Sequence, residues 1–285
     1  MATANGTRRV VVVTGASSGI GLATAVAFAQ GGDRVVAILR PSSRRDALED
    51  ALRAARVELE PLILDVTDAA AVDSGMVALA ERYGPIDILI NNAGVGYTGT
   101  LEELSIEDFR QSMEVNFFAV ARMTKAVLPG MHAAGHGHVI AVTSLGGVIG
   151  QPFNDAYCAA KFAVEGLYES LNPVEARFGV AVSIVEPGPV ATQFRAHSHR
   201  RDVPEDPALA ALKERYISVT ERGFDRAQSA ADVAAVIVGI TREDAPVLRY
   251  QSSNFTRRLV GRKLIDVTGE AVIGLTSAWL DDPTS

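Results

Sequence analysis

The sequence predicts an α/β fold, a single doubly wound parallel sheet with helices on both faces. The first reason is that short apolar runs alternate with longer runs of helical periodicity along most of the chain. The second is that glycine or a polar side chain follows directly after most of the apolar runs. In open sheets of this class ligands bind at the carboxyl ends of the strands, so these residues are expected to meet at one site.

Composition narrows the possible functions. The chain has 285 residues, of which 48% are hydrophobic and 21% are charged, as expected for one soluble domain spanning residues 1–285. A net charge of −7 argues against nucleic acid as a partner. No apolar run approaches the ~18 residues of a membrane span. The single cysteine, Cys158, cannot form an internal disulfide and has no partners for a zinc site, so we expect a cytoplasmic protein without a metal.

The first strand, helix and intervening turn form an anion-binding pattern. Residues 10–14 form an apolar strand, residues 15–21 read Gly-Ala-Ser-Ser-Gly-Ile-Gly, and residues 22–30 are helical. Glycines allow a sharp turn, and the free amides at a helix start favour a negative charge. The glycine spacing differs from the standard dinucleotide fingerprint. Its place between strand and helix nevertheless predicts a pyrophosphate site.

The second strand, residues 34–39, ends in Arg40 with no carboxylate beside it. An acidic residue there would bind the ribose hydroxyls of NAD, whereas arginine attracts the 2′-phosphate of NADP. We therefore predict NADP as the cofactor. The alternative is that Arg40 only faces solvent.

Two further strands end in short polar side chains. A helix over 44–56 precedes the strand 58–64, which ends in Asp65 and Val66, where the carboxylate is placed to meet the adenine amino group. A helix over 68–83 precedes the strand 86–90, which ends in Asn91-Asn92-Ala93-Gly94. These small residues suit close backbone approach to a ligand, although a plain turn is the alternative.

Residues 106–131 form one long helical pattern, and Asn116 lies inside it, where asparagine has poor helix propensity. Its side chain either bonds a neighbouring carbonyl or binds a water molecule next to Lys161. The histidines at 132, 136 and 138 belong to a helix end and a loop and do not predict a metal site.

The stretch from Ser144 to Lys161 carries the strongest chemical prediction. Ser144 ends the apolar strand 139–143, and a helix capped by Asn154 and Asp155 follows. Tyr157 then lies in the first helical turn with Lys161 one turn further on. A nearby ammonium and the helix start favour the phenolate, which predicts proton exchange near neutral pH. By itself a tyrosine and a lysine at this spacing are usually an ordinary stacked pair.

The remainder of the chain completes the sheet and covers its edge. Pro173 predicts either a kink in the helix or a restart, and the strand 180–185 ends in a Glu-Pro-Gly-Pro sequence. A polar loop over 193–207 and a helix over 208–221 are expected to cover the site. A helix over 230–241, a strand over 246–250 and an amphipathic tail from residue 254 follow, and the tail caps the fold or covers the pocket. This order is that of a Rossmann fold.

The whole chain resembles the short-chain dehydrogenases/reductases. The family motifs occur in order: Thr14-Gly15-x-x-x-Gly19-Ile20-Gly21, Asn91-Asn92-Ala93-Gly94, Asn116, Ser144, Tyr157-x-x-x-Lys161 and Pro187-Gly188. The sequences at 37–40, 150–167 and 247–250 are most similar to the estradiol-type hydroxysteroid and retinol dehydrogenases. Tyr216 is retained from the estrogen enzyme, but Val219 stands where that enzyme has a histidine, which argues against estradiol itself.

The resemblance implies a role for each motif. Tyr157 is the proton donor or acceptor, Lys161 lowers its pKa and binds the nicotinamide ribose, Ser144 orients the substrate oxygen, and Asn116 holds a relay water. The residues implied to bind NADP are Gly15, Ser17, Ser18, Gly19, Ile20, Arg40, Asp65, Val66, Asn92, Ala93, Gly94, Tyr157, Lys161, Pro187, Gly188, Val190 and Thr192. A small lipophilic alcohol, ketone or aldehyde is the implied substrate, and a homodimer or homotetramer the implied assembly.

Two other functions are compatible with the sequence. One is a reductase of acyl-carrier or polyketide ketone intermediates, in which Arg195 and Arg200 would meet the carrier. The other is a protein that binds NADP as a sensor without chemistry. The presence of Ser144, Tyr157 and Lys161 argues against the sensor, which needs only the cofactor site.

Overall fold

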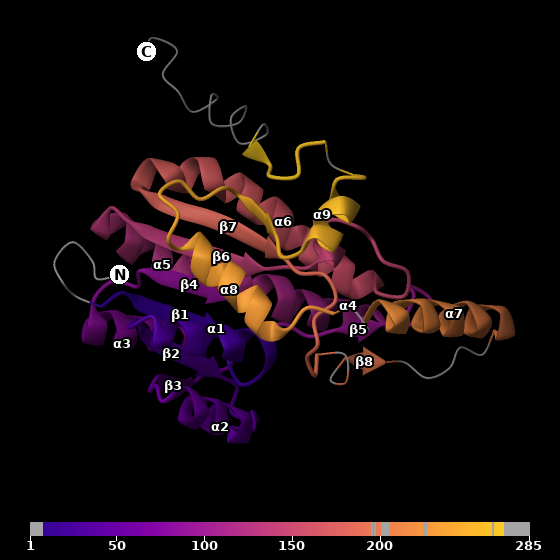
Figure 1. Ribbon diagram of the computed structural model, residues 1–285, viewed down its shortest axis with the longest axis horizontal. Coiled ribbons are helices and arrows are strands. Elements are labelled where there is room, and N and C mark those ends of the chain that lie inside the picture. The colour runs from indigo at the N-terminus through magenta and orange to yellow at the C-terminus, as the bar shows by residue number, and fades with distance from the viewer. Residues whose placement is uncertain are drawn as a thin grey trace, which may run out of the picture.

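One parallel sheet forms the centre of the molecule. The computed structural model describes residues 8–194, 196, 198–200, 206–224, 227–263 and 265–270. Seven strands lie in the order β3-β2-β1-β4-β6-β7-β9, with every neighbouring pair parallel. They are β1 Val10–Thr14, β2 Arg34–Leu39, β3 Glu60–Ile63, β4 Ile88–Asn91, β6 Gly137–Val142, β7 Val180–Glu186 and β9 Arg249–Gln251. The predicted fold class is confirmed (Figure 1).

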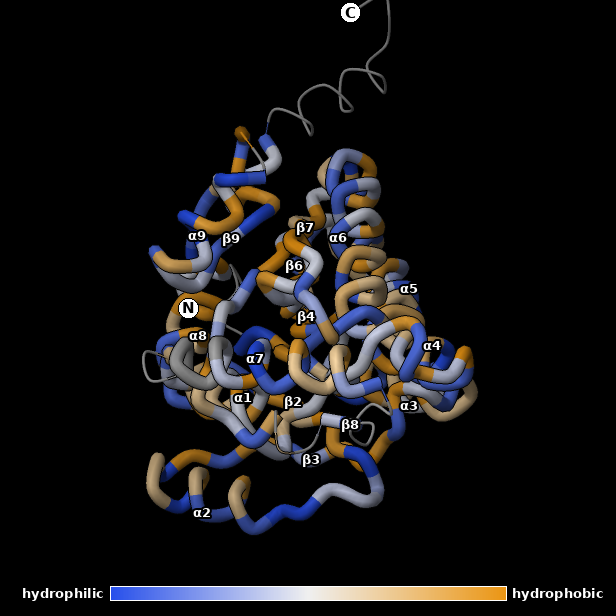
Figure 2. The backbone as a smooth tube through the Cα atoms, turned by 90° about the vertical axis from the view of Figure 1, so that its right-hand side faces the viewer, coloured by the Kyte–Doolittle hydropathy of each residue, from blue (hydrophilic) through white to orange (hydrophobic). Residues whose placement is uncertain are grey.

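Helices cover both faces of the sheet. On one face lie α1 Gly19–Gln30, α2 Asp46–Ala55 and α8 Ala230–Ile240, and on the other α3 Ala69–Tyr83, α5 Ala119–Ala134 and α6 Asp155–Glu175. Figure 2 looks toward the end of the sheet and shows the strands between α1 and α8 on one side and α5 and α6 on the other. The inner strands β1, β4, β6 and β7 are mostly apolar, as expected where helices cover both faces of a sheet, whereas the edge strands β3 and β9 are more polar.

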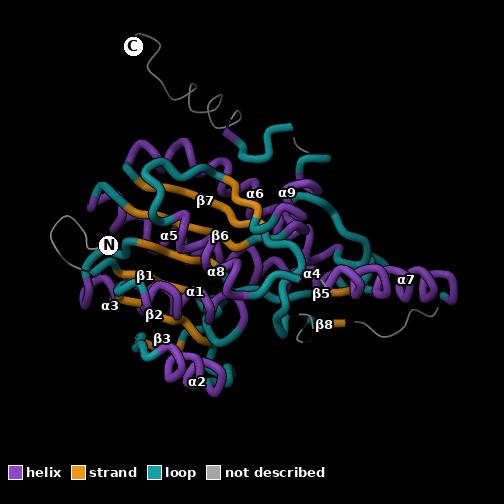
Figure 3. Tube along the Cα trace, in the orientation of Figure 1, coloured by secondary structure: helices purple, strands orange, loops and turns teal. Residues whose placement is uncertain are grey.

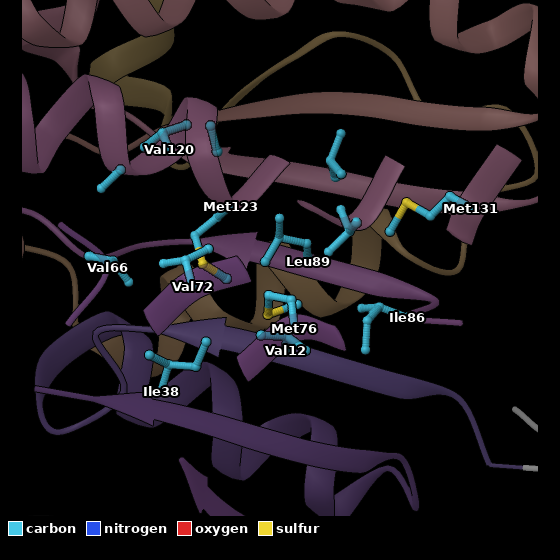
Figure 4. Close-up of a cluster of buried hydrophobic side chains, with 14 of the residues drawn as sticks. Val12, Ile38, Val66, Val72, Met76, Ile86, Leu89, Val120, Met123 and Met131 are labelled. Carbon is cyan, nitrogen blue, oxygen red and sulfur yellow. The ribbon is translucent and has the colours of Figure 1, made fainter. Parts of the chain in front are cut away.

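The core consists of two clusters of buried side chains, one on each face. In Figure 4, Met76 of α3 and Met123 of α5 lie beside Val12 and Leu89 of the sheet, and Met131 lies further along α5 in the same cluster. All five residues of β1 are buried. Strands β1 and β4 are neighbours in the sheet. After β1 the chain continues to β2 on one side, and after β4 it continues to β6 on the other side. This is the switch point at which ligands bind in such sheets.

The remaining elements gather beyond the carboxyl ends of the strands. They are the two-stranded sheet of β5 Tyr97–Thr98 and β8 His199–Arg200, with α4 Ile106–Met113, α7 Pro207–Phe224 and α9 Asn254–Val260 (Figure 3). Neither β5 nor β8 was predicted, because two-residue strands paired across about a hundred positions leave no periodic signal. Among the described residues no helix has the length and apolar character needed to cross a membrane.

Two helices differ from the sequence prediction. The long pattern over 106–131 is interrupted by one π-helical turn, Glu114–Phe118, which joins α4 to α5. Such turns occur often at functional sites. In α6 the helix continues through Pro173 and ends two residues later at Glu175, followed by a 3₁₀ turn, Ala176–Phe178. The restart of the helix at Pro173, one of the two predicted alternatives, is therefore wrong, because α6 is continuous through this residue.

Candidate active site

A cavity of about 1530 Å³ extends along the carboxyl ends of the central strands. It brings together every residue predicted for cofactor binding and catalysis except Asn116, which is buried beside it. The cavity continues from the Gly15 turn and Arg40, past Ser144 and Tyr157, to α7 and α9. One continuous space therefore joins the predicted cofactor residues to a second half that α7 and α9 line.

The glycine turn leaves the start of α1 open to the cavity. Ser18 is the N-cap residue, but its side chain accepts no capping hydrogen bond, and no acidic residue lies in the first turn. Gly15 and Gly19 have φ of +65° and +57°. A Cβ atom at Gly15 would lie 2.8 Å from the Cα of Ala93. The turn thus packs tightly against the end of β4 and presents backbone amides to an anion.

Thr14 and Asn92 hold this turn in place. The backbone amides of Asn92 and Ala93 donate to Thr14 Oγ1 at 2.9 and 3.0 Å, and Asn92 Nδ2 donates to the carbonyl oxygens of Thr14 and Gly15 at 3.0 and 3.2 Å. The paired asparagines are therefore more than a plain turn. Asn91 points into the core, where its amide donates to Thr124 and Tyr168.

Arg40 and Asp65 lie at the predicted nucleotide end of the cavity. Arg40 is exposed and makes no ion pair with any described residue, whereas Arg44 pairs with Asp46 at 2.7 Å. Asp65 accepts hydrogen bonds from the backbone and hydroxyl of Thr67 at 2.9 and 2.8 Å. The uncapped helix start, the glycines and an unpaired guanidinium fit a dinucleotide with several negative charges.

Ser144, Tyr157 and Lys161 meet at the centre of the cavity. Ser144 lies two residues beyond β6 and caps the 3₁₀ turn Leu145–Gly147 by accepting a hydrogen bond from Gly146 N at 3.0 Å. A side-chain hydrogen bond joins Ser144 to Tyr157, which lies in the first turn of α6 as predicted. Lys161 Nζ lies 5.9 Å from the centre of the Tyr157 ring and donates to Val142 O at 3.0 Å.

The electrostatics of this group differ from the prediction. Burial raises the pKa of Tyr157 to about 12, although the hydrogen bond with Ser144 acts in the opposite direction. Burial also lowers the pKa of Lys161 to about 8, opposed by the charge of Glu165. The raised pKa of Tyr157 runs against the expected phenolate near neutral pH, because desolvation favours the protonated phenol.

Capping of α6 is a second local correction. Asn154 is the N-cap residue, but its side chain makes no capping bond. Its amide donates instead to Pro152 O at 3.0 Å and to the Tyr216 hydroxyl at 2.6 Å. Asp155 accepts from Leu101 N at 2.7 Å. Both side chains therefore connect the start of α6 to neighbouring elements.

Asn116 lies in the π-helical turn and is fully buried. Its amide oxygen accepts from Val95 N at 3.0 Å, and its amide nitrogen donates to Val95 O at 2.9 Å and Ser112 Oγ at 3.2 Å. A Cβ atom at Gly94 would lie 2.9 Å from Asn116 Oδ1 and 3.6 Å from Lys161 Nζ. Of the two predicted roles, the structure shows the hydrogen bond to a neighbouring carbonyl, that of Val95. The side chain also lies close to Lys161.

The second half of the cavity combines apolar side chains with polar ones, among them Gln151, Ser198 and Thr220. Phe194 covers Tyr157, with ring centres 5.7 Å apart. The apolar lining residues that sequence reasoning did not single out are Val95, Leu145, Phe194, Ile217, Phe255 and Leu259. They come from loops and from α7 and α9, where no motif marks them. The residues Arg195, His197 and Arg201 lie outside the described part, as do the side chains of Arg200 and Val219.

Within the described residues, no group of three or more His, Cys, Asp or Glu side chains could hold a metal ion. Cys158 is buried beside Tyr157, and burial raises the pKa of its thiol. This environment disfavours a thiolate nucleophile.

Comparison with known proteins identifies the family. The family model for short chain dehydrogenase matches residues 9–202. Human retinol dehydrogenase 8 is 35% identical over 282 residues, covering 95% of this chain and 90% of that protein. Human 17-beta-hydroxysteroid dehydrogenase type 1 is 37% identical over 273 residues, covering 92% and 83%. The chain belongs to the short-chain dehydrogenase family, whose members are oxidoreductases of alcohol and ketone groups.

Solved structures agree with this assignment. A short-chain dehydrogenase from Streptomyces avermitilis has a TM-score of 0.78 and 32% identity, covering 96% of this chain and 98% of its own. An alcohol dehydrogenase from Thermococcus sibiricus (28% identity, TM-score 0.68, 86% and 95% covered) is complexed with 5-hydroxy-NADP. A short-chain dehydrogenase/reductase from Burkholderia phymatum is complexed with NAD. It is 27% identical, has a TM-score of 0.76, and the match covers 89% of this chain and 92% of that chain. The family thus uses nicotinamide cofactors of both kinds.

Proposed function

We propose that this protein transfers a hydride reversibly between NADP(H) and the carbonyl carbon of a lipophilic ketone or aldehyde. The observation that carries the proposal is one continuous cavity in which Ser144, Tyr157 and Lys161 lie between the Gly15–Arg40 end and a part where apolar side chains, among them Phe194, Ile217 and Phe255, occur beside polar ones. The names of the two relatives, a retinol dehydrogenase and a hydroxysteroid dehydrogenase, support a bulky apolar substrate.

The three central side chains have complementary roles in this reaction. The nicotinamide, when bound, supplies or accepts the hydride. In reduction, Tyr157 donates its phenolic proton to the substrate oxygen while Ser144 donates a hydrogen bond to the same oxygen. The Lys161 ammonium favours the resulting phenolate. In the oxidative direction Tyr157 takes the proton back from the alcohol, so both directions balance.

Arg40 supports NADP as the cofactor. The guanidinium lies at the end of β2 without an ion pair in the described part of the chain, and Asp46 is already paired with Arg44. A 2′-phosphate on the adenosine ribose would supply the missing counter-charge. We also assign to cofactor binding the other predicted residues that line this part of the cavity. They are Gly15, Ser17, Ser18, Gly19, Ile20, Asp65, Val66, Asn92, Ala93, Gly94, Pro187, Gly188, Val190 and Thr192.

The test measures oxidation of NADPH and NADH in parallel with steroid ketones, retinal, long-chain aldehydes and acyl thioesters. We expect turnover with NADPH on one lipophilic class. A preference for NADH would contradict the role of Arg40, and binding of both cofactors without turnover on any substrate would favour the sensor. Turnover confined to acyl thioesters would favour the carrier-linked reductase.

A further inference from the structure

A buried group of charged side chains lies next to Thr143 and the turn that Ser144 begins. Arg249 Nε lies 3.2 Å from Glu165 Oε2 and 3.6 Å from Glu186 Oε1, and Arg249 also pairs with Glu169. The side chains of Glu165 and Arg249 are each 8% exposed, and that of Glu186 is fully buried. Three carboxyl groups thus share one guanidinium from β9.

Glu165 connects this group to the catalytic elements. It lies one helical turn after Lys161 on α6, and its Oε1 accepts a hydrogen bond from Thr143 Oγ1 at 2.7 Å. Thr143 directly precedes Ser144. A Cβ atom at Gly147 would lie 3.1 Å from Glu165 Oε1, so the carboxyl group lies against the turn that Ser144 begins. One side chain therefore contacts both elements that carry the proposed catalytic residues.

Packing alone does not require a carboxyl group at this position. Burying a charged or polar group costs free energy, and well-packed apolar residues often replace such groups without loss of stability. The contacts of Glu165 are directional, with one oxygen on Thr143 and the other on Arg249. A leucine of similar size would fill the space but could fix neither partner.

We propose that Glu165 is a positioning residue that sets Ser144 relative to Lys161 and Tyr157 by bonding Thr143 with one oxygen and Arg249 with the other. This inference rests on the proposed function. Glu165 also faces charged groups on three elements: Lys161 and Glu169 on α6, Glu186 on β7 and Arg249 on β9.

The test uses four variants of the full chain: E165L, T143V, T143S and E169Q. E165L removes both bonds, T143V removes only the hydroxyl, and T143S keeps it. E169Q is the matched control, because Glu169 bonds Arg249 but makes no contact with Thr143. For each variant, kcat and KM are measured with NADPH and the ketone found for the unaltered protein. NADPH affinity is measured by fluorescence, and the urea midpoint reports folding.

We expect E165L and T143V to lower kcat at least about tenfold, the size of effect that misplacement of a catalytic group can produce. KM and NADPH affinity should stay within about twofold, while T143S and E169Q keep kcat near that of the unaltered protein. If E165L fails to fold, the T143V and T143S pair decides the matter.

Unchanged kcat in T143V, or equal losses in T143V and T143S, would overturn the proposal. So would a kcat loss matched by an equal loss of NADPH affinity, which would show general damage to the site. An unaltered protein without turnover on any substrate contradicts both the proposed function and this inference. Normal turnover with insensitive variants contradicts the positioning role alone.

Discussion

Lys213 Nζ lies 2.6 Å from Glu103 Oε1, and this ion pair joins α7 to the turn that follows β5. The two side chains are 9% and 8% exposed. Burial raises the pKa of Glu103, but hydrogen bonds from Lys213 and Thr100 outweigh it, and the net pKa lies below the ordinary value. Because Lys213 also lines the cavity, the pair fixes the helix that lines the half beyond Ser144 and Tyr157.

Replacing Lys213 by methionine should therefore loosen α7. The buried Glu103 carboxylate would lose a charged partner, which typically costs about 1–3 kcal/mol of unfolding free energy. We expect KM for lipophilic substrates to rise while NADPH affinity is unchanged, since the cofactor half of the cavity is distant from α7. Urea unfolding and steady-state kinetics measure the two effects. Arg215→Met, an exposed change on the same helix, is the control, and equal behaviour of the two variants would contradict the role of the pair.

The central strands could be predicted from the sequence because β1, β4, β6 and β7 are short, mostly apolar runs that are buried along almost their whole length. Strands β1 and β2 have the predicted bounds, while β3 and β4 begin two residues later than predicted. Hydrophobic runs report burial, whereas strand ends depend on pairing with neighbours, which the sequence alone does not show. The apolar wall of the cavity escaped prediction for a related reason. Phe194, in a loop, and Phe255, in α9, become wall residues only when segments distant in the sequence fold together.

The site residues were predicted by spacing, but their electrostatics were not. Four positions from Tyr157 to Lys161 fix a shared helix face regardless of the surroundings. The burial that raises the Tyr157 pKa to about 12 depends on the tertiary fold, in which Phe194, 37 positions away, places its ring 5.7 Å from that of Tyr157. Likewise, the capping role expected of Asn154 was lost to Tyr216, a partner 62 positions away.

Tyr157→Phe tests the proton donor. Phenylalanine keeps the ring that packs against Phe194 but cannot transfer a proton. We expect kcat to fall by about 10²–10⁴-fold, the usual contribution of a general acid, with NADPH affinity nearly unchanged. Single-turnover kinetics and a cofactor titration measure both quantities. Turnover equal to that of the unaltered protein in a folded variant would remove Tyr157 from the mechanism.

Arg40→Ala tests the cofactor. Loss of a charge-assisted contact to the 2′-phosphate, worth about 1.5–3 kcal/mol, should weaken NADPH binding roughly 10- to 100-fold. NADH lacks that phosphate, so its affinity should stay constant. Arg53→Ala is the matched control, because Arg53 is exposed on α2 and pairs with Asp50 away from the cavity. Equal weakening of both cofactors would show that Arg40 does not select between them.

Substituting Gly15 or Gly32 by alanine distinguishes two effects. One is the close contact between the Gly15 turn and the end of β4, and the other is backbone strain alone. Both glycines have positive φ, +65° and +87°, so alanine strains the backbone at either position. A Cβ atom at Gly32 meets nothing within 4 Å, whereas at Gly15 it would lie 2.8 Å from Ala93 Cα. We expect Gly32→Ala to cost about 1–2 kcal/mol without affecting NADPH affinity. Gly15→Ala should cost more stability and also weaken NADPH binding, measured by urea unfolding and fluorescence titration.

Glu165→Gln tests the buried charged group through the pH dependence of stability. Burial and the Glu186 carboxylate raise the pKa of Glu165 from 4.5 to about 8. Between these two values the folded protein holds a proton that the unfolded chain has released. The free energy of unfolding therefore falls as pH rises through this window, by at most about 1.4 kcal/mol per pH unit for one proton.

The comparison is best made from pH 6.5 to pH 8. Below that range His138, whose pKa burial lowers from 6.5 to about 3, contributes a slope of the opposite sign. The unaltered protein should lose stability across the range, and E165Q, which has no proton to release, should lose less. Glu169→Gln should behave like the unaltered protein, because Glu169 is one-third exposed and lies at the edge of the group. If the free energy of unfolding has the same pH dependence in the unaltered protein and in E165Q, the Glu165 carboxyl group is already ionised below this range. Arg249 would then supply its counter-charge.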